Sequence, residues 1–196
     1  DGFDEYGSEY YGKLSDNGRT YHCRLERYKG RYNTPIRLYK LHGSLDYVPF
    51  YRRNEYGWMI PENYVKIKWG IDAGNIMKSR KSKVGYDISP FEYHADFLTG
   101  TTSKIKRYSE PLLFRKLFKK FRKNLQNAEM LIIIGYGCKD EGINEIIKEN
   151  FDYNHKPLFI IDANATDESQ VDLFKKELQA KLLRVQINDI SKALFE

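Results

Sequence analysis

Cysteine is scarce in this sequence, which contains only Cys23 and Cys138 among its 196 residues. Neither cysteine belongs to a Cys-x-x-Cys pair, and two thiols cannot form a four-cysteine zinc site. No metal site is therefore predicted. Free thiols are the ordinary state of cysteine in the cytoplasm, so we expect a cytoplasmic protein.

Long hydrophobic runs are also lacking. The longest, Met130 to Ile134, falls far short of the roughly 20 residues that span a bilayer. The acidic start, Asp1 to Glu5, does not resemble a signal peptide. The sequence thus predicts neither membrane insertion nor secretion, and since it begins without Met we expect it to be a fragment of a longer protein.

The composition is that of a globular protein, with 41% hydrophobic and 31% charged residues. Tyrosine is abundant, at 16 residues, and suits both ligand-facing surfaces and irregular loops that pack on a small core. The formal charge is +6 and is unevenly distributed. Between residues 101 and 123, nine basic residues face one acid, Glu110; they are Lys104, Lys106, Arg107, Arg115, Lys116, Lys119, Lys120, Arg122 and Lys123. This Lys104–Lys123 basic stripe fits nucleic acid, a nucleotide's phosphates, an acidic partner or a solvated helix face.

The two parts of the chain differ in texture. Residues 1–110 are rich in Gly, Tyr and Asn, and two alternating stretches, 36–41 and 64–69, predict short strands within an irregular Tyr/Gly-rich layer. Residues 111–196 alternate helix-like and strand-like segments. They predict a helix after Pro111, a strand at 130–134, a helix capped by Asp140, a strand at 158–162, a helix opened by Asp167 and a strand at 182–187. This order predicts an α/β fold containing half of a Rossmann-like parallel sheet.

Two of the predicted parallel strands end in small or polar turns, Gly135-Tyr136-Gly137 and Asp162-Ala163-Asn164. Ligands of open parallel sheets bind outside the carboxyl ends of the strands, where glycine admits them close to the backbone. Asp162 suits hydrogen bonding to ribose hydroxyls. The same residues are also common in ordinary turns, so both interpretations stay open.

His42 is the candidate catalytic residue, because it follows a predicted strand and precedes Gly43-Ser44. An imidazole at the carboxyl end of a strand can act as a general base near neutral pH, although a lone histidine more often has a structural role. The other histidines, His22, His94 and His155, show no ligand-like spacing and are expected at the surface.

Three blocks together resemble the zinc-free bacterial branch of SIR2-like (sirtuin-like) proteins. The first is Leu38-Tyr39-Lys40-Leu41-His42-Gly43-Ser44-Leu45, the second begins at Phe97-Leu98-Thr99-Gly100, and the third is the strand from Leu131 followed by Gly135-Tyr136-Gly137 and, later, Asp140 and Ile143-Asn144. The blocks occur in the order of the family and span about residues 36 to 164.

The resemblance implies an NAD site. It makes His42 the catalytic base beside the nicotinamide ribose, with Gly43, Gly135, Tyr136, Gly137, Asp162 and Asn164 as cofactor-binding residues; Gly135, Tyr136 and Gly137 would line the adenosine and Asp162 would contact its ribose. The implied reaction is NAD hydrolysis with release of nicotinamide, through an oxocarbenium-like state. Members of this branch act in antiphage defence, and the resemblance suggests that role.

The departures from the family pattern are equally specific. Gly137 stands where the family usually has Ser, and the zinc cysteines of the deacylase branch are absent. The Gly-Ala-Gly phosphate loop and the Thr-Asn-Tyr-Asp segment, which carries a catalytic asparagine, do not occur. We therefore expect this to be the C-terminal portion of the domain, inactive without its N-terminal half.

Two functional hypotheses follow. The first is an NAD+ glycohydrolase, with deacylase activity left open; the second is a non-catalytic nucleotide-sensing module, or one that docks on nucleic acid or a partner through the Lys104–Lys123 basic stripe. Homo-oligomerisation is left open, and resemblance of fold alone would fix neither function.

Overall fold

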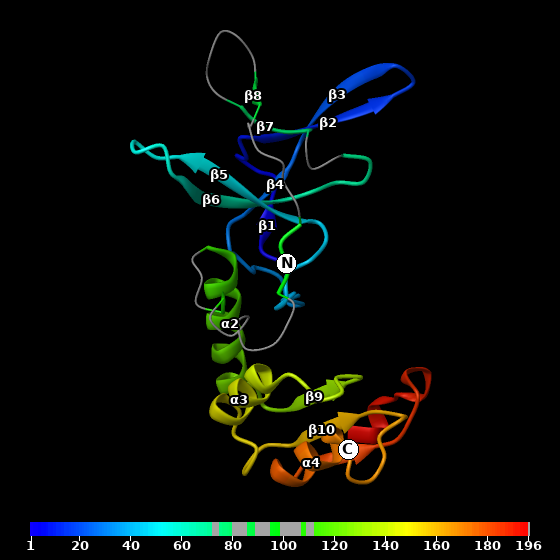
Figure 1. Ribbon diagram of the computed structural model, residues 1–196. Helices are drawn as coiled ribbons and strands as arrows, with labels where there is room; N and C mark the ends of the chain where they lie inside the picture. The colour runs from blue at the N-terminus through cyan, green and yellow to red at the C-terminus, as the bar shows by residue number, and fades with distance from the viewer. Residues whose placement is uncertain (72–74, 80–85, 89–94, 99–106, 109–111, 196) are drawn as a thin grey trace. The chain divides into compact units, whose positions relative to one another are not determined.

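Antiparallel strands make up most of the first of the two units into which the chain divides, Asp1–Phe118 and Lys119–Glu196. The computed structural model describes residues 1–71, 75–79, 86–88, 95–98, 107–108 and 112–195 (Figure 1). One four-stranded sheet has the order β1 (Phe3–Asp4), β4 (Glu26–Tyr28), β6 (Met59–Lys66), β5 (Tyr47–Arg53). The other has the order β3 (Arg19–Arg24), β2 (Tyr10–Asp16), β7 (Ile76–Ser79), β8 (Tyr86–Ile88).

The core of this unit draws on strands of both sheets. Its buried members are Tyr10, Leu25, Val48, Phe50, Val65, Ile71 and Ile76. The region predicted to be irregular thus contains two antiparallel sheets, whereas residues 29–46 form no strand apart from the isolated bridge at Gly43. Glycine in this region does not always break structure: Gly12 lies inside β2, where a Cβ would stand 2.5 Å from Cγ2 of Ile71. Gly12, a residue type that usually interrupts strands, therefore leaves room for the core side chain of Ile71.

The strand predicted at residues 36–41 does not form. Ile36 is 88% exposed and Leu38 is also exposed, so these two apolar side chains do not cover a described sheet or core. The strand predicted at 64–69 lies earlier, as β6, and ends at Lys66. Trp69 stands fully exposed in the turn beyond it. Alternation alone did not separate paired strands from extended loops.

The second unit contains a three-stranded parallel sheet with the order β11-β10-β9, in which neighbouring strands are consecutive in the chain. Its elements are β9 (Leu131–Ile134), α3 (Glu141–Asn150), β10 (Leu158–Ile161), α4 (Gln170–Glu177) and β11 (Lys181–Leu183), followed by the short 3-10 turns η2 (Ile187–Asp189) and η3 (Lys192–Phe195). Parallel crossovers are right-handed, so α3 and α4 cover the same face of the sheet. The chain is thus of mixed α/β class, with a small parallel sheet and two antiparallel sheets.

The helix predicted after Pro111 is confirmed as α2 (Leu113–Asn127), although Pro111 itself lies outside the described residues. Four residues of its apolar stripe are buried, namely Phe114, Leu117, Phe118 and Leu125. Basic side chains on the opposite side are exposed, namely Arg115, Lys116, Lys119 and Lys123. In the part of the chain that is described, no helix combines the length and apolar character needed to cross a membrane.

The predicted strand–helix alternation of the second unit is confirmed, with local differences. Helix α4 begins after Ser169, whose hydroxyl accepts from the N–H of Asp172, and not at Asp167. Leu173, predicted in its apolar stripe, is exposed. Strand β9 is only partly buried, since Ile132 and Ile134 are 38% and 49% exposed. Among the described strands β9 lies at the edge of the parallel sheet, and of its residues Ile133 is the one that is buried.

Candidate functional site

His42 lies in a turn with its side chain at the surface. Its backbone carbonyl accepts a hydrogen bond of 2.7 Å from the N–H of Leu98, and Gly43 forms an isolated antiparallel bridge with Phe97. The first two blocks of the SIR2-like resemblance, about 50 residues apart in the chain, therefore lie side by side. Residues 99–104 of the second block lie outside the described residues.

Gly43 is the one residue of this segment that must be glycine. Its φ is +83°, in the left-handed region, and a Cβ there would run into the backbone carbonyl oxygen of Asp96. Any larger residue would therefore push residues 96–98 away and displace the backbone on which His42 sits.

Asp96 anchors the segment that supports His42. Its carboxylate accepts two hydrogen bonds from Nη2 of Arg107, at 2.8 and 3.0 Å, and one of 2.5 Å from the hydroxyl of Tyr64 on β6. Burial, followed by the hydrogen bond to Asp96, raises the pKa of Tyr64, so this hydroxyl stays a donor at physiological pH. No spacing or motif singles out Asp96 in the sequence, and the sequence prediction missed it.

Side chains on either side of His42 in the chain also stabilise the turn that carries it. Nζ of Lys40 donates to Oγ of Ser44 at 2.8 Å and lies 3.3 Å from Oδ1 of Asp46. Burial alone would raise the pKa of Asp46, but hydrogen bonds from Ser44 and Lys40 outweigh it and the pKa is lowered. The carboxylate therefore stays charged and keeps Lys40 folded across the turn.

In the second unit, the two predicted turns meet at the carboxyl edge of the parallel sheet. The N–H of Gly135 donates to the carbonyl of Ile161 at 3.0 Å, and the N–H of Asp162 donates to that of Leu183 at 3.2 Å. Burial, and secondly the charge of Asp162, raises the pKa of the Cys138 thiol to about 11. The hydrogen bond from Gly135 to Ile161 places the start of the turn after β9 beside the end of β10, where the Asp162 turn begins.

The turn after β9 is fixed by side chains of its own block. The hydroxyl of Tyr136 lies 3.0 Å from Oδ1 of Asn144 and 3.0 Å from the carbonyl of Asp140, and Nδ2 of Asn144 donates to the carbonyl of Cys138 at 2.9 Å. The carboxylate of Asp140 caps α3 by accepting from the N–H of Ile143, as predicted. Asn144, which the sequence prediction did not include among the site residues, holds the loop in place.

The remaining predicted residues lie along the same edge. Oδ1 of Asp162 accepts from the N–H of Asn164 at 2.9 Å, which closes a tight turn. Oδ2, the second oxygen of the carboxylate, does not take part in this hydrogen bond. Asn164 is exposed. At Gly137, no described atom outside its immediate neighbours lies within 4 Å of the place a Cβ would take, so the position is open.

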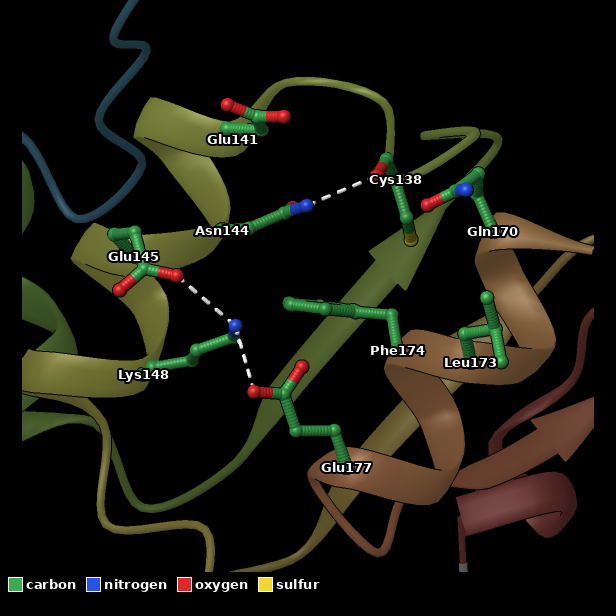
Figure 2. A pocket seen from close by; sticks show the side chains of 9 residues that line it. All are labelled: Cys138, Glu141, Asn144, Glu145, Lys148, Gln170, Leu173, Phe174 and Glu177. Atoms are coloured by element: carbon green, nitrogen blue, oxygen red, sulfur yellow. Dashed lines mark hydrogen bonds and ion pairs between the residues drawn. The ribbon is translucent and has the colours of Figure 1, made fainter.

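A cavity of about 200 Å³ lies between α3 and α4, bounded at one end by Cys138 (Figure 2). Three glutamates, Glu141, Glu145 and Glu177, line it against one lysine. Nζ of Lys148 bridges the helices, 3.0 Å from Glu145 and 2.6 Å from Glu177. The excess of acidic groups makes this cavity unsuited to a pyrophosphate.

His42 belongs to the first unit, and the turns at Gly135 and Asp162 belong to the second. A single cleft shared by all three therefore stays a prediction. Within the described ranges, no three His, Cys, Asp or Glu side chains are grouped so that they could hold a metal ion. Comparison with known proteins finds no matching family model, and neither a curated protein nor a solved structure shows significant similarity to the chain.

Proposed function

We propose that this chain is the C-terminal portion of a SIR2-like NAD+ glycohydrolase domain that belongs to a bacterial antiphage defence protein. The observation that carries the proposal is the meeting of the Gly135 and Asp162 turns at the carboxyl edge of a parallel sheet. Nucleotides bind at that edge in Rossmann-like folds. On this proposal, β9, β10 and β11 form half of such a sheet, and the N-terminal half supplies the phosphate loop and the catalytic asparagine.

The role that the resemblance implies for each residue is compatible with its surroundings. Asp162 would use Oδ2 to accept from a ribose hydroxyl, because Oδ1 already accepts from Asn164. Gly135 and Gly137 present backbone without side chains, which allows the adenosine to approach closely. His42, exposed on a turn whose backbone is held by Leu98 and Gly43, would remove a proton from a ribose hydroxyl or water as the glycosidic bond breaks.

The test is nicotinamide release from NAD by the full-length protein, measured with and without His42→Ala. We expect the substitution to reduce kcat by about 100-fold or more, because a general base contributes on that order. His155→Ala is the matched control, since His155 is exposed and pairs with Asp152 in the second unit. Equal activity of the two variants, or no nicotinamide release under any condition that supports folding, would contradict the proposal.

The second candidate is a module that binds a nucleic acid or an acidic partner without turnover. The exposed basic side chains of α2, Arg115, Lys116, Lys119 and Lys123, favour it, because four cations on one helix attract phosphates. Salt-sensitive DNA binding that is lost in Lys119→Ala/Lys123→Ala, with NAD left intact, would support this function instead.

A further inference from the structure

The hairpin between β5 and β6 ends in a tightly held tip, residues 54–58. The N–H of Asn54 donates to the carbonyl of Trp58 at 2.9 Å, and the N–H of Gly57 donates back to the carbonyl of Asn54 at 3.0 Å. Oδ1 of Asn54 accepts from the N–H groups of Tyr56, at 3.0 Å, and Trp58, at 2.9 Å. One side chain thus fixes the backbone of the whole tip, with Gly57 in the left-handed region at φ +80°.

This fixed tip presents two aromatic rings to solvent. Tyr56 is 77% exposed and Trp58 is 72% exposed. Two aromatic rings on one preorganised turn form an apolar surface that a partner could cover. Because Asn54 already orders the backbone, little conformational entropy would be lost when a ligand covers the rings.

The strand register adds a cation to the same face. Arg52 pairs with Ile60, so these two side chains lie on one side of the hairpin. Trp58 precedes Ile60 by two residues, just before β6 begins, and the same alternation predicts that it lies on that side too. Diagonal neighbours in such a ladder lie about 7–8 Å apart, within reach of an arginine and an indole. Arg52 is exposed, and the only acid within the tip is Glu55. The surface therefore combines stacking rings with a guanidinium group.

We propose that this Tyr56–Trp58 tip binds single-stranded nucleic acid, with the rings stacking on bases and Arg52 contacting a phosphate. Aromatic rings beside a cation are the chemistry by which proteins hold unpaired strands without reading sequence. The net charge of +6 complements a polyanion. A bilayer fits less well, because Asn54 and Glu55 would enter the interface together with the rings. The inference does not rest on the NAD proposal.

The chain contains two tryptophans, Trp58 and Trp69, which makes the test specific. In the full chain carrying Trp69→Phe, Trp58 is the only indole, and we expect an oligo-dT strand to quench its fluorescence. In the matched Trp58→Phe chain, the fully exposed Trp69 reports instead, and its emission is expected to stay unchanged. Both substitutions replace surface rings and should leave the fold intact, which circular dichroism checks.

Affinity for a labelled oligo-dT strand is then measured by anisotropy. We expect Trp58→Ala to weaken binding by about tenfold, from the loss of one stacking platform. Arg52→Ala should weaken it and lower the salt dependence by about one phosphate contact. Trp69→Ala is the control and should bind as the unchanged chain does.

Three results would overturn the proposal. One is an unchanged Trp58 signal in the presence of oligo-dT. Another is undiminished binding by Trp58→Ala, which would assign the affinity to the basic face of α2. The third is a Trp58 response to vesicles of phosphatidylcholine and phosphatidylserine but not to oligo-dT, which would make the tip a membrane contact.

Discussion

The hydroxyl of Tyr136 lies 3.0 Å from the side-chain oxygen of Asn144, eight residues further along the chain. This contact joins the turn after β9 to the second turn of α3, and the amide of Asn144 completes it by donating to the carbonyl of Cys138 at 2.9 Å. Tyr136 and Asn144, both in the block that resembles SIR2-like proteins, are therefore physically connected and stabilise one another. The residues between them form a loop that this side-chain hydrogen bond closes.

Removing this connection should loosen the second unit. We expect Asn144→Ala to reduce the free energy of unfolding by about 1–2 kcal/mol, because the carbonyl of Cys138 and the hydroxyl of Tyr136 lose a partner. Urea unfolding followed by circular dichroism measures the change. Asn154→Ala, at an exposed position, should lie within about 0.5 kcal/mol of the unchanged chain. Equal effects of the two substitutions would show that the contact does not stabilise the loop.

Substitution by serine should affect stability differently at two nearby glycines of the sheet edge, Gly137 and Gly135. Gly137 has open space around its Cβ direction and an ordinary φ, so Gly137→Ser should change stability by less than about 0.5 kcal/mol. Gly135 has a φ of +61°, so Gly135→Ser should cost about 1 kcal/mol or more.

The same pair tests the proposed nucleotide site. Gly137→Ser supplies the hydroxyl that the SIR2-like family usually has, and NAD binding by the full-length protein, followed by calorimetry, should tighten by several-fold from one added hydrogen bond. A Gly137→Ser protein that folds normally and binds NAD more weakly would show that the adenosine does not lie against this turn.

A second glycine pair separates backbone strain from steric clash near His42. Gly43 and Gly57 have similar φ values, +83° and +80°, but only at Gly43 would a Cβ meet another backbone segment. Gly57→Ala should cost about 1 kcal/mol, from the left-handed conformation alone. Gly43→Ala should cost more, by about 1–3 kcal/mol, since residues 96–98 must move as well. Thermal unfolding of the two variants measures the difference, and indistinguishable midpoints would contradict the close packing of Gly43 on Asp96.

The second unit could be predicted from the sequence because its signals are local. Continuous apolar runs gave β9 and β10, and Asp140 gave the start of α3, since a cap and its helix lie within a few residues of each other. The first unit depends on pairing between distant segments. Residues 36–41 alternate as a strand does, yet none of the described strands pairs with them, and the support of His42 comes from Asp96 and Leu98 instead. Such long-range partners leave no periodic trace in the sequence.

Cys138 offers a direct test of how the two turns of the sheet edge lie together. A thiol whose pKa is raised to about 11 has only about one molecule in a thousand as thiolate at pH 8, and the thiolate is the reactive form. In a Cys23→Ser chain, where Cys138 is the only thiol, alkylation by iodoacetamide should therefore be slow and should accelerate as the pH rises toward 11. Burial is the larger cause of the raised pKa and the charge of Asp162 the smaller.

Removing the charge of Asp162 should shift the pKa of Cys138 in a known direction. Asp162→Asn lowers the pKa of Cys138, so at pH 8 the thiolate fraction and the alkylation rate should both rise, by no more than about tenfold. Asp152→Asn is the control, because Asp152 is an exposed acid that pairs with His155 away from the turn. The rate is followed by mass spectrometry of the intact protein, and the pKa is taken from its pH dependence. If Asp162→Asn and Asp152→Asn give the same pKa for Cys138, the carboxylate of Asp162 does not lie beside the Gly135–Cys138 turn, and the nucleotide site proposed at this edge loses the arrangement on which it depends.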